Sequence, residues 1–195
     1  DSLPRLTAVR CPICALPTPD SQVCGACLRH PPHFDATSAV FRYEFPVDRL
    51  VQALKYAHRL AVTDVLGRML AHGAPARRPD LIVPVPLSPV RLAQRGFNQA
   101  LEIARPLARA LDASVETRGV HRSRDTPPQA GLPWKERAKN IRHAFECGID
   151  LGGKTVLLVD DVMTTGSTLD ELARILKAHG AARVENRVLA RALKD

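Results

Sequence analysis

Apolar and polar positions along the chain switch repeatedly between the period of a strand and the period of a helix, which is typical of an α/β protein. A short alternating run at Ala39–Phe45 predicts a strand, and Pro46 ends it. The helical period that follows, from 47 to 72, predicts two helices, the second capped by Thr63 or Asp64.

Further segments extend this alternation to the end of the chain. They are a short buried strand opening 80–89, a helix over 91–111, a strand over 113–121, a polar loop over 122–137, a short helix over 135–142, a strand from 156, a helix over 169–178 and a last strand over 182–190. Pro106 lies inside the expected helix over 91–111, so we expect a kink or a break there. Gly96 is expected to form a tight turn and Asn98 a helix cap.

The segment Val156–Thr168 combines an apolar strand with side chains that suit a phosphorylated ligand. Its last residues are Thr164, Thr165, Gly166, Ser167 and Thr168, and a helical pattern follows them. A hydroxyl-rich loop at a helix N-terminus offers backbone N–H groups, side-chain donors and a positive dipole end to one anion. The loop therefore predicts a phosphate site.

Two adjacent carboxylates, Asp160 and Asp161, lie between this strand and the loop. They accept hydrogen bonds from hydroxyl groups such as those of a ribose, so the segment predicts a ribose 5-phosphate site. One alternative is a buried parallel strand that ends in an ordinary Asp turn. Another is the acidic pocket of a phospho-receiver domain, which lies near the start of that fold, whereas here only one helix and one strand are expected to follow.

Four cysteines near the start of the chain form two Cys-x-x-Cys pairs, Cys11 with Cys14 and Cys24 with Cys27. This spacing suits a structural zinc ion held by four thiolates, with a pair of disulfides or unused thiols as the alternative. Pro31-Pro32 marks the end of the module, so we expect a zinc ribbon-like unit at 1–34 and a larger domain at 35–195.

The net charge of +8 suggests an anionic partner. Between residues 91 and 142, eleven basic residues face five acidic ones, so most of the excess lies there. A pyrophosphate group needs a few arginines, whereas nucleic acid needs a broad basic stripe. We expect the cationic loop over 122–137 to be a lid over a phosphorylated ligand.

No apolar run approaches the roughly 18 residues that span a bilayer, and residues 1–10 lack the apolar core of a secretory signal. We therefore expect no membrane span and a cytoplasmic location.

Lys55 is expected to be a solvated helix residue on local grounds.

The segment Val156–Thr168 resembles the signature of the type I phosphoribosyltransferases, which bind phosphoribosyl pyrophosphate (PRPP). The order of features over nearly the whole chain resembles the ComF family of competence-associated, phosphoribosyltransferase-like proteins. The matching features are the two cysteine pairs, Tyr43–Phe45 leading to Lys55-Tyr56, Val83–Pro86, Arg95–Gln99, Arg124-x-Thr126-x-x-Gln129 with Arg137 and Asn140, and Leu157–Thr168. Family members often carry Gly soon after the Lys-Tyr pair, where this chain has Ala57-His58.

The resemblance implies a parallel sheet flanked by helices, a Mg-dependent PRPP site, and a role in handling single-stranded DNA during transformation beside a helicase-like ComF partner. On this basis Asp160 and Asp161 would hold the ribose hydroxyls, and the loop that begins at Met163 and ends at Thr168 would hold the 5-phosphate. The residues expected to neutralise the pyrophosphate are Pro86, Leu87, Ser88, Arg95, Arg122 and Arg124.

Two alternatives to this function stay open. The first is a non-catalytic module that binds single-stranded DNA and uses the PRPP site as a sensor. The second is a phosphoribosyltransferase of nucleotide salvage. No residue identifies an acceptor base, so the sequence does not name the reaction.

Overall fold

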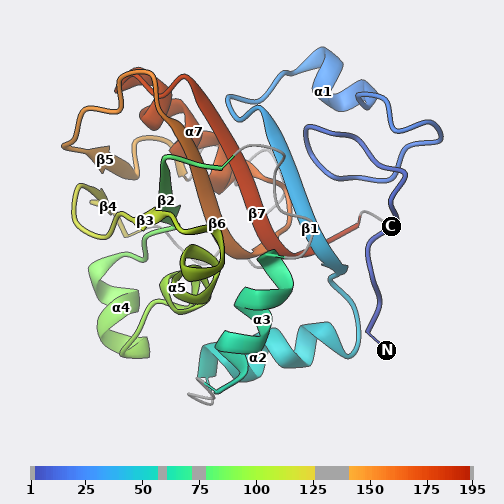
Figure 1. Ribbon diagram of the computed structural model, residues 1–195, viewed down its shortest axis with the longest axis horizontal. Coiled ribbons are helices and arrows are strands. Elements are labelled where there is room, and N and C mark those ends of the chain that lie inside the picture. The colour runs from blue at the N-terminus through green and yellow to red at the C-terminus, as the bar shows by residue number, and fades with distance from the viewer. Residues whose placement is uncertain (1–2, 57–60, 72–77, 126–140, 194–195) are drawn as a thin grey trace.

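Five parallel strands form the centre of the computed structural model, which describes residues 3–56, 61–71, 78–125 and 141–193 (Figure 1). In spatial order they are β1 (Ala36–Arg42), β7 (Arg183–Arg191), β6 (Thr155–Met163), β2 (Leu81–Pro84) and β3 (Ser114–Val115). All four neighbouring pairs are parallel. The expected α/β class with a parallel sheet is confirmed.

Helices cover both faces of this sheet. They are α7 (Ser167–Ala178) on one face, and α3 (Ala61–Ala71) and α5 (Gln99–Leu111) on the other. The sequence of β6 explains the arrangement, because its residues are apolar on both sides of the pleat. Val156 and Leu158 pack with α7, whereas Leu157 and Val159 pack with α3 and α5.

The remaining elements lie around the sheet. They are α1 (Gly25–Arg29), α2 (Val47–Tyr56), α4 (Pro89–Arg95), β4 (Val120–Arg122) and β5 (Phe145–Cys147). β4 and β5 form a separate antiparallel pair. In Figure 1 this pair lies on one side of the molecule, and α1 lies on the other side, next to β1. None of the helices in the described ranges is long and apolar enough to cross a membrane.

Several predicted boundaries were wrong. β1 begins three residues before the expected strand at 39–45, and α3 begins at Ala61, so Thr63 and Asp64 lie inside it and do not cap it. The expected strand over 113–121 is two short strands, β3 and β4, which belong to different sheets. β5 was not predicted. Most of the expected helix over 135–142 and most of the cationic loop lie outside the described residues, and only 141 and 142 of that helix are described.

The expected helix over 91–111 is two helices, and the break is at Gly96 rather than at Pro106. Gly96 has a φ of 78°, a left-handed conformation that ends α4, and the Asn98 side chain caps α5. Pro106 lies inside α5, which runs on without a break. It packs against Gly67 of α3, where an added Cβ would come within 2.2 Å of the proline ring. The missing side chain of Gly67 thus makes room for the proline.

The N-terminal segment runs along the outer edge of the sheet beside β1. The Leu6 N–H donates to the Val40 carbonyl (3.0 Å), and the Thr37 N–H donates to the Pro12 carbonyl (3.1 Å). Cys11, Cys14 and Cys27 belong to the same buried cluster as β6 and α7 side chains. A separate unit at 1–34 stays a prediction, but its cysteines pack directly on the larger domain.

Candidate functional site

The strand order creates a crevice between β2 and β6. The chain leaves β2 towards β3 on one side and leaves β6 towards β7 on the other. The two connections pass over opposite faces of the sheet, through α5 and α7. Ligands of open α/β sheets bind where the strand order reverses in this way, at the carboxyl ends of the strands. Val159–Met163 and Pro84–Ser88 meet at this point.

The carboxylate pair lies at the carboxyl end of β6, together with a lysine from α2. The Lys55 ammonium is 2.9 Å from Oδ2 of Asp161, whose side chain is only 5% exposed. The backbone N–H of Val162 donates to Oδ1 of Asp161 (2.8 Å), and the N–H of Asp161 donates to Oδ1 of Asp160 (2.9 Å). Asp161 is therefore held on both oxygens.

Burial is the main electrostatic influence on Asp160. Burial, and after it the neighbouring Asp161, raise the pKa of Asp160, whereas Lys55 and the Asp161 N–H oppose the shift, and the net result is a pKa of about 8. Asp160 keeps some exposed surface, but protein surrounds it closely enough for the loss of water to dominate. Burial would lower the pKa of Lys55, but Asp161 and Asp160 outweigh burial and raise it. The lysine stays charged, and Asp160 favours its protonated form.

The prediction that Lys55 is solvated was wrong. α2 buries Val47, Val51 and Leu54, and Lys55 follows Val51 by four residues, so it lies on the inner face of the helix. The 47, 51, 55 spacing was visible in the sequence. Its partner was not, because Asp161 is more than one hundred residues away.

The phosphate-sized loop follows β6 and begins α7. Gly166 occupies its centre with a φ of 85°, and a Cβ there would lie 2.6 Å from the terminal methyl of Met163. The Thr165 and Ser167 hydroxyl oxygens are 3.0 Å apart, and the Ser167 N–H donates to Oγ1 of Thr165 (3.3 Å). A glycine is therefore required at 166 both by the backbone conformation and by the close approach of Met163. The hydroxyls lie in the turn at the positive end of α7.

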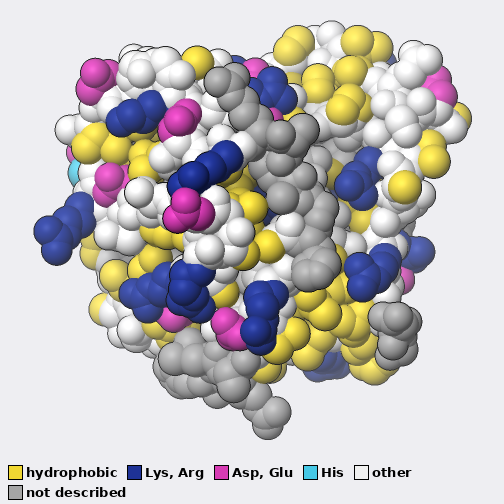
Figure 2. All heavy atoms as spheres, viewed as in Figure 1, with side chains coloured by type: hydrophobic (Ala, Val, Ile, Leu, Met, Phe, Trp, Pro, Cys, Tyr) yellow, Lys and Arg dark blue, Asp and Glu magenta, His cyan; other side chains and the backbone are white. Residues whose placement is uncertain are grey.

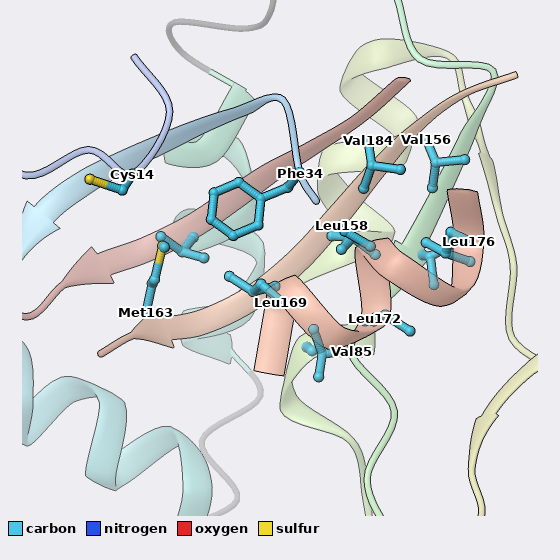
Figure 3. Close-up of a cluster of buried hydrophobic side chains, with 14 of the residues drawn as sticks. Cys14, Phe34, Val85, Val156, Leu158, Met163, Leu169, Leu172, Leu176 and Val184 are labelled. Carbon is cyan, nitrogen blue, oxygen red and sulfur yellow. The ribbon is translucent and has the colours of Figure 1, made fainter. Parts of the chain in front are cut away.

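Met163 differs from the rest of the predicted loop. It is the last residue of β6, is 2% exposed, and packs beside Phe34 and Leu169 (Figure 3). Its carbonyl accepts hydrogen bonds from the Ala192 N–H (3.0 Å) and from Arg191 (2.9 Å). Met163 thus belongs to the buried core that packs against the loop, and it is not one of the hydroxyl residues of the loop.

The residues after β2 lie on the other side of the crevice. Ser88 is fully buried and caps α4, accepting from the Arg91 N–H (3.3 Å) and donating to Asp125 (2.5 Å). Pro86 and Leu87 are partly exposed in the turn that leads to it. Ser88 already uses its hydroxyl in the structure, so the turn offers mainly its shape and backbone.

Arginines from two other elements complete the cationic side. Arg95, the last residue of α4, contacts Gln99 and acts electrostatically on Lys55. Arg122 of β4 is 6% exposed, and its guanidinium lies 5.7 Å above the ring of Phe145. Burial and Arg91 lower the pKa of Arg122, whereas Asp125 and Asp160 raise it. Lys55 thus contacts the carboxylate pair, Arg122 interacts electrostatically with Asp160, and Arg95 interacts electrostatically with Lys55.

Arg124 is placed differently from Arg122. It is exposed, and its guanidinium donates to the Arg142 carbonyl (3.2 Å). The structure brings Arg122 to the carboxylate side of the crevice and leaves Arg124 at the surface, next to the start of the undescribed part of the loop.

A hollow elsewhere on the molecule does not belong to this site. Arg78, Asp80, Asp112 and Ser114 line it at the amino ends of β2 and β3. Arg78 is already paired there with Asp112 (2.7 Å). It lies at the opposite end of the strands from the carboxylate pair.

The four cysteines form the second candidate site. Their sulfur atoms all lie within 4.8 Å of one another, and those of Cys14 and Cys24 are 3.6 Å apart. A disulfide requires about 2.05 Å, whereas a tetrahedral zinc ion with bonds of about 2.3 Å places its sulfurs about 3.8 Å apart. The disulfide alternative is therefore wrong for Cys14 and Cys24, and the geometry fits a metal ion.

The four cysteines differ in how readily they form thiolates. Burial opposes the shift, but the Cys27 N–H and the neighbouring thiols lower the pKa of Cys24 to about 7. Burial raises the pKa of Cys14 to about 11 and that of Cys27 as well. A bound cation would favour the thiolate form of all four in so small a volume.

Comparisons with known proteins show the family to which the chain is related. A family model described as phosphoribosyl transferase domain matches residues 79–195. The chain is 38% identical over 197 residues to DNA utilization protein YhgH of Escherichia coli strain K12, covering 97% of this chain and 87% of that protein. It is 35% identical over 182 residues to Competence protein F of Haemophilus influenzae, covering 88% and 80%.

Among solved structures, the purine phosphoribosyltransferase from Pyrococcus horikoshii is 23% identical, with a TM-score of 0.42, covering 66% of this chain and 71% of that one. The family model begins just before β2. The match to the E. coli protein extends further, over the segment that carries the cysteines.

Proposed function

The chain belongs to the phosphoribosyl transferase domain family, together with the YhgH and competence F proteins, and on this premise we propose that it binds PRPP at the crevice between β2 and β6. The predicted ComF resemblance is confirmed. We propose further that the protein acts in DNA uptake during natural transformation, in the cytoplasm. The names of its relatives, which refer to competence and DNA utilization, support this role.

The observation that carries the proposal is the carboxylate pair held by Lys55 beside an anion loop. Asp160 and Asp161 would accept hydrogen bonds from the 2- and 3-hydroxyls of the ribose. The turn at Thr164–Thr168 would hold the 5-phosphate through backbone and hydroxyl donors. Both groups lie at the end of the same strand, so one ribose 5-phosphate reaches both.

The cations would bind the pyrophosphate. Arg95 of α4 interacts electrostatically with Lys55, and Arg122 of β4 with Asp160, and positive side chains there would offset charge that collects on a departing pyrophosphate. In a transfer reaction the bond from the anomeric carbon to pyrophosphate breaks, and a bond to an acceptor forms at the same carbon. Positioning and charge stabilisation carry such a step, so no protein nucleophile is needed.

Mg²⁺ fits this proposal as a companion of the ligand. In the described ranges, the cysteines are the only cluster of three or more His, Cys, Asp or Glu side chains that could hold a metal by themselves. Asp161 is already paired with Lys55. Mg²⁺ prefers oxygen ligands and keeps waters, so it would enter together with the ligand on the side of Asp160 and would supply positive charge to the pyrophosphate.

Titration calorimetry with PRPP and Mg²⁺ tests the ligand. We expect Asp160→Asn and Asp161→Asn, combined, to lower the affinity at least about a hundredfold, because two bidentate acceptors are lost. Asp150→Asn, an exposed carboxylate in the turn before β6, is the matched control and should bind as the parent does. A double variant that binds PRPP with the affinity of the parent chain would contradict the proposal that the carboxylate pair holds the ribose.

Pyrophosphate release from PRPP, measured against a panel of bases and single-stranded DNA, separates a transferase from a sensor. Release with one acceptor identifies an enzyme. Binding without release favours the non-catalytic module, and release with a nucleobase alone favours salvage.

We propose zinc as the metal of the cysteine site, because four thiolates in a tetrahedral arrangement select it. Untreated protein should contain about one equivalent of zinc per chain by metal analysis. Less than about half an equivalent contradicts the assignment.

Direct binding of single-stranded DNA is the second candidate function, and the positive charge of the chain favours it. Figure 2 shows Lys and Arg side chains interspersed with Asp and Glu on the face in view, without a continuous basic stripe. Ion pairs such as Arg105–Glu102 (3.0 Å) and Arg109–Asp64 (3.3 Å) account for part of this mixture. The exposed Arg124 and Arg142 are the better candidates for phosphate contacts.

Fluorescence anisotropy with labelled single-stranded DNA at several salt concentrations tests this function. Each lost phosphate contact should reduce the slope of log affinity against log salt by about 0.7. We expect Arg124→Gln with Arg142→Gln to reduce it by more than one contact. An affinity for DNA that depends neither on salt nor on these arginines would exclude this basic surface as the DNA-binding site.

We also propose the helicase-like ComF protein as a partner. Co-purification from cells that express both proteins tests it, and recovery of each alone contradicts it.

A further inference from the structure

A buried arginine joins the cysteine site to the candidate phosphate site. Arg191 is the last residue of β7 and is 3% exposed. Its Nε donates to the Cys14 carbonyl (2.8 Å). Its Nη1 donates to the Met163 carbonyl (2.9 Å) and also contacts the Thr164 carbonyl. One guanidinium therefore spans a metal-ligating segment and the first residues of the anion loop.

The shape of the guanidinium makes this a rigid connection. Its donors lie in one plane at fixed angles, so the carbonyls that they contact are fixed relative to one another. Met163 and Thr164 set the course of the backbone into the turn at Gly166. A shift of the Cys14 carbonyl would therefore move the start of the anion loop or break these hydrogen bonds.

Charge supports the same connection, because Arg191 is buried and contacts Cys14, one of the four clustered cysteines. Four thiolates around one divalent zinc ion carry a net charge of −2, and a guanidinium buried among carbonyls needs such a countercharge. The metal-bound cluster thus favours the position in which Arg191 also holds the loop.

A second contact between the same regions runs beside the first. Phe34 is 4% exposed and lies behind the turn, 3.8 Å from where a Cβ of Gly166 would be. Figure 3 shows Phe34 beside Met163 and Leu169, with Cys14 on the same side of the cluster. The His33 N–H donates to Oδ1 of Asp170 (2.6 Å) in the first turn of α7. The segment after the cysteines therefore also fixes the helix that begins at the loop.

We propose that Arg191 is a positioning residue that couples the metal-bound cysteine cluster to the anion loop, so that zinc and a ribose 5-phosphate ligand strengthen each other's binding. This inference rests on the proposed PRPP site. It adds a role in ligand recognition to a metal site that would otherwise serve folding alone.

The test is the linkage between the two ligands, measured in the full zinc-loaded chain. Zinc release to a chromogenic chelator is followed with and without saturating PRPP, and PRPP affinity is measured by calorimetry. In the parent chain we expect PRPP to slow zinc release about fivefold or more, since coupled sites usually affect each other by factors of about 5 to 150.

Arg191→Lys keeps the positive charge but loses the planar guanidinium, whose separate N–H groups contact both segments. We expect this variant to keep one zinc per chain, to bind PRPP about tenfold more weakly, and to lose the effect of saturating PRPP on zinc release. Arg183→Lys is the matched control at the other end of β7, where the arginine is 47% exposed and pairs with Glu185. It should behave as the parent does.

A lower melting temperature in Arg191→Lys, with parental PRPP affinity and parental linkage, would show a purely structural role and overturn the inference. Should the variant fail to fold, the parent chain decides alone, because an uncoupled metal site releases zinc equally fast with and without PRPP. A parent chain that binds PRPP without any linkage overturns only this inference. A parent chain that binds neither PRPP nor ribose 5-phosphate overturns the proposed function as well.

Discussion

The two sides of the candidate site are built in different ways. The contiguous half, residues 160–168, comes from one strand end and the turn after it. The assembled half consists of Lys55, Arg95 and Arg122, from α2, α4 and β4. The first half depends on local backbone geometry, and the second depends on the packing of three distant elements. Single substitutions in the two halves should therefore change stability and ligand binding in different ways.

The largest expected effect follows from replacing Lys55, which belongs to the assembled half. Lys55→Met leaves Asp161 buried beside Asp160 without its cation, so we expect the free energy of unfolding to fall by about 2 kcal/mol. This is less than for a fully buried pair because Lys55 is 24% exposed. Urea unfolding measures the loss, and calorimetry should show weaker PRPP binding.

Lys177→Met is the control for that change. Lys177 also lies 2.9 Å from a carboxylate, Asp35, but both side chains are about one-third exposed and lie away from the crevice. We expect a loss below about 1 kcal/mol and unchanged PRPP binding. Equal losses in the two variants would show that burial of the Lys55 pair has no energetic consequence.

The second prediction breaks the contiguous half at Gly166. Gly166→Ala places a side chain on a backbone with a φ of 85° and within 2.6 Å of Met163. We expect a loss of about 1.5 kcal/mol in stability together with a large loss of PRPP affinity. Gly153→Ala has a similar φ of 71° but no atom within 4 Å, so it isolates the backbone cost. If both variants lose equal stability and keep PRPP binding, contact with Met163 does not shape the loop.

The difference between the halves also explains what could be predicted from the sequence. The strand, the carboxylates and the loop are consecutive, so their types and order indicated the geometry directly. Lys55 was misjudged because its partner is distant in the chain. Ser88 was expected to face pyrophosphate, but its hydroxyl caps α4 and binds Asp125. The cysteine spacing indicated a metal site, but no local pattern connected Cys14 with Arg191.

The fold shows the same limit. The strands β2, β6 and β7 followed from apolar runs, because strands buried on both faces leave a strong local signal. β3 and β5 have two and three residues, too few for periodicity to reveal. The chain breaks at Gly96 and not at Pro106, because Gly67 of α3 leaves room for the proline ring of α5. This contact joins two different helices, so no local sequence pattern revealed it.

The third prediction uses pH to compare the halves without removing Lys55. The folded-state pKa of Asp160 is raised to about 8, above its ordinary value near 3.8. Between these values the folded state holds a proton that the unfolded state releases. This contribution to stability is therefore fully present below about pH 4 and is lost as the pH rises towards 8, by at most about 1.4 kcal/mol per pH unit.

The ligand-free chain should therefore lose about 1 kcal/mol more between pH 6 and pH 7 than Asp160→Asn does. Other titrating groups are common to both proteins, so the difference isolates Asp160. Urea unfolding at the two pH values measures it. Parallel losses in the two proteins would show that the pKa of Asp160 is not raised in the folded chain.

The smallest expected effect concerns a contact within the assembled half. Ser88 begins α4, which carries Arg95, and its hydroxyl donates to Asp125, three residues after Arg122. This hydrogen bond therefore joins two of the segments that supply cations. Ser88→Ala should cost about 1 kcal/mol, mainly through the lost helix cap. Asp125→Ala should cost less, because that side chain is 46% exposed.

A double-mutant cycle of these two substitutions separates the cap from the connection. We expect a coupling energy of about 0.5 kcal/mol, measured by urea unfolding, since the hydrogen bond is short but one partner is solvated. In the presence of PRPP the coupling should increase, because the ligand would hold Arg95 and Arg122 together and immobilise the segments that carry them. Purely additive losses, with and without PRPP, would mean that α4 and β4 position their arginines independently and that packing alone assembles this half of the site.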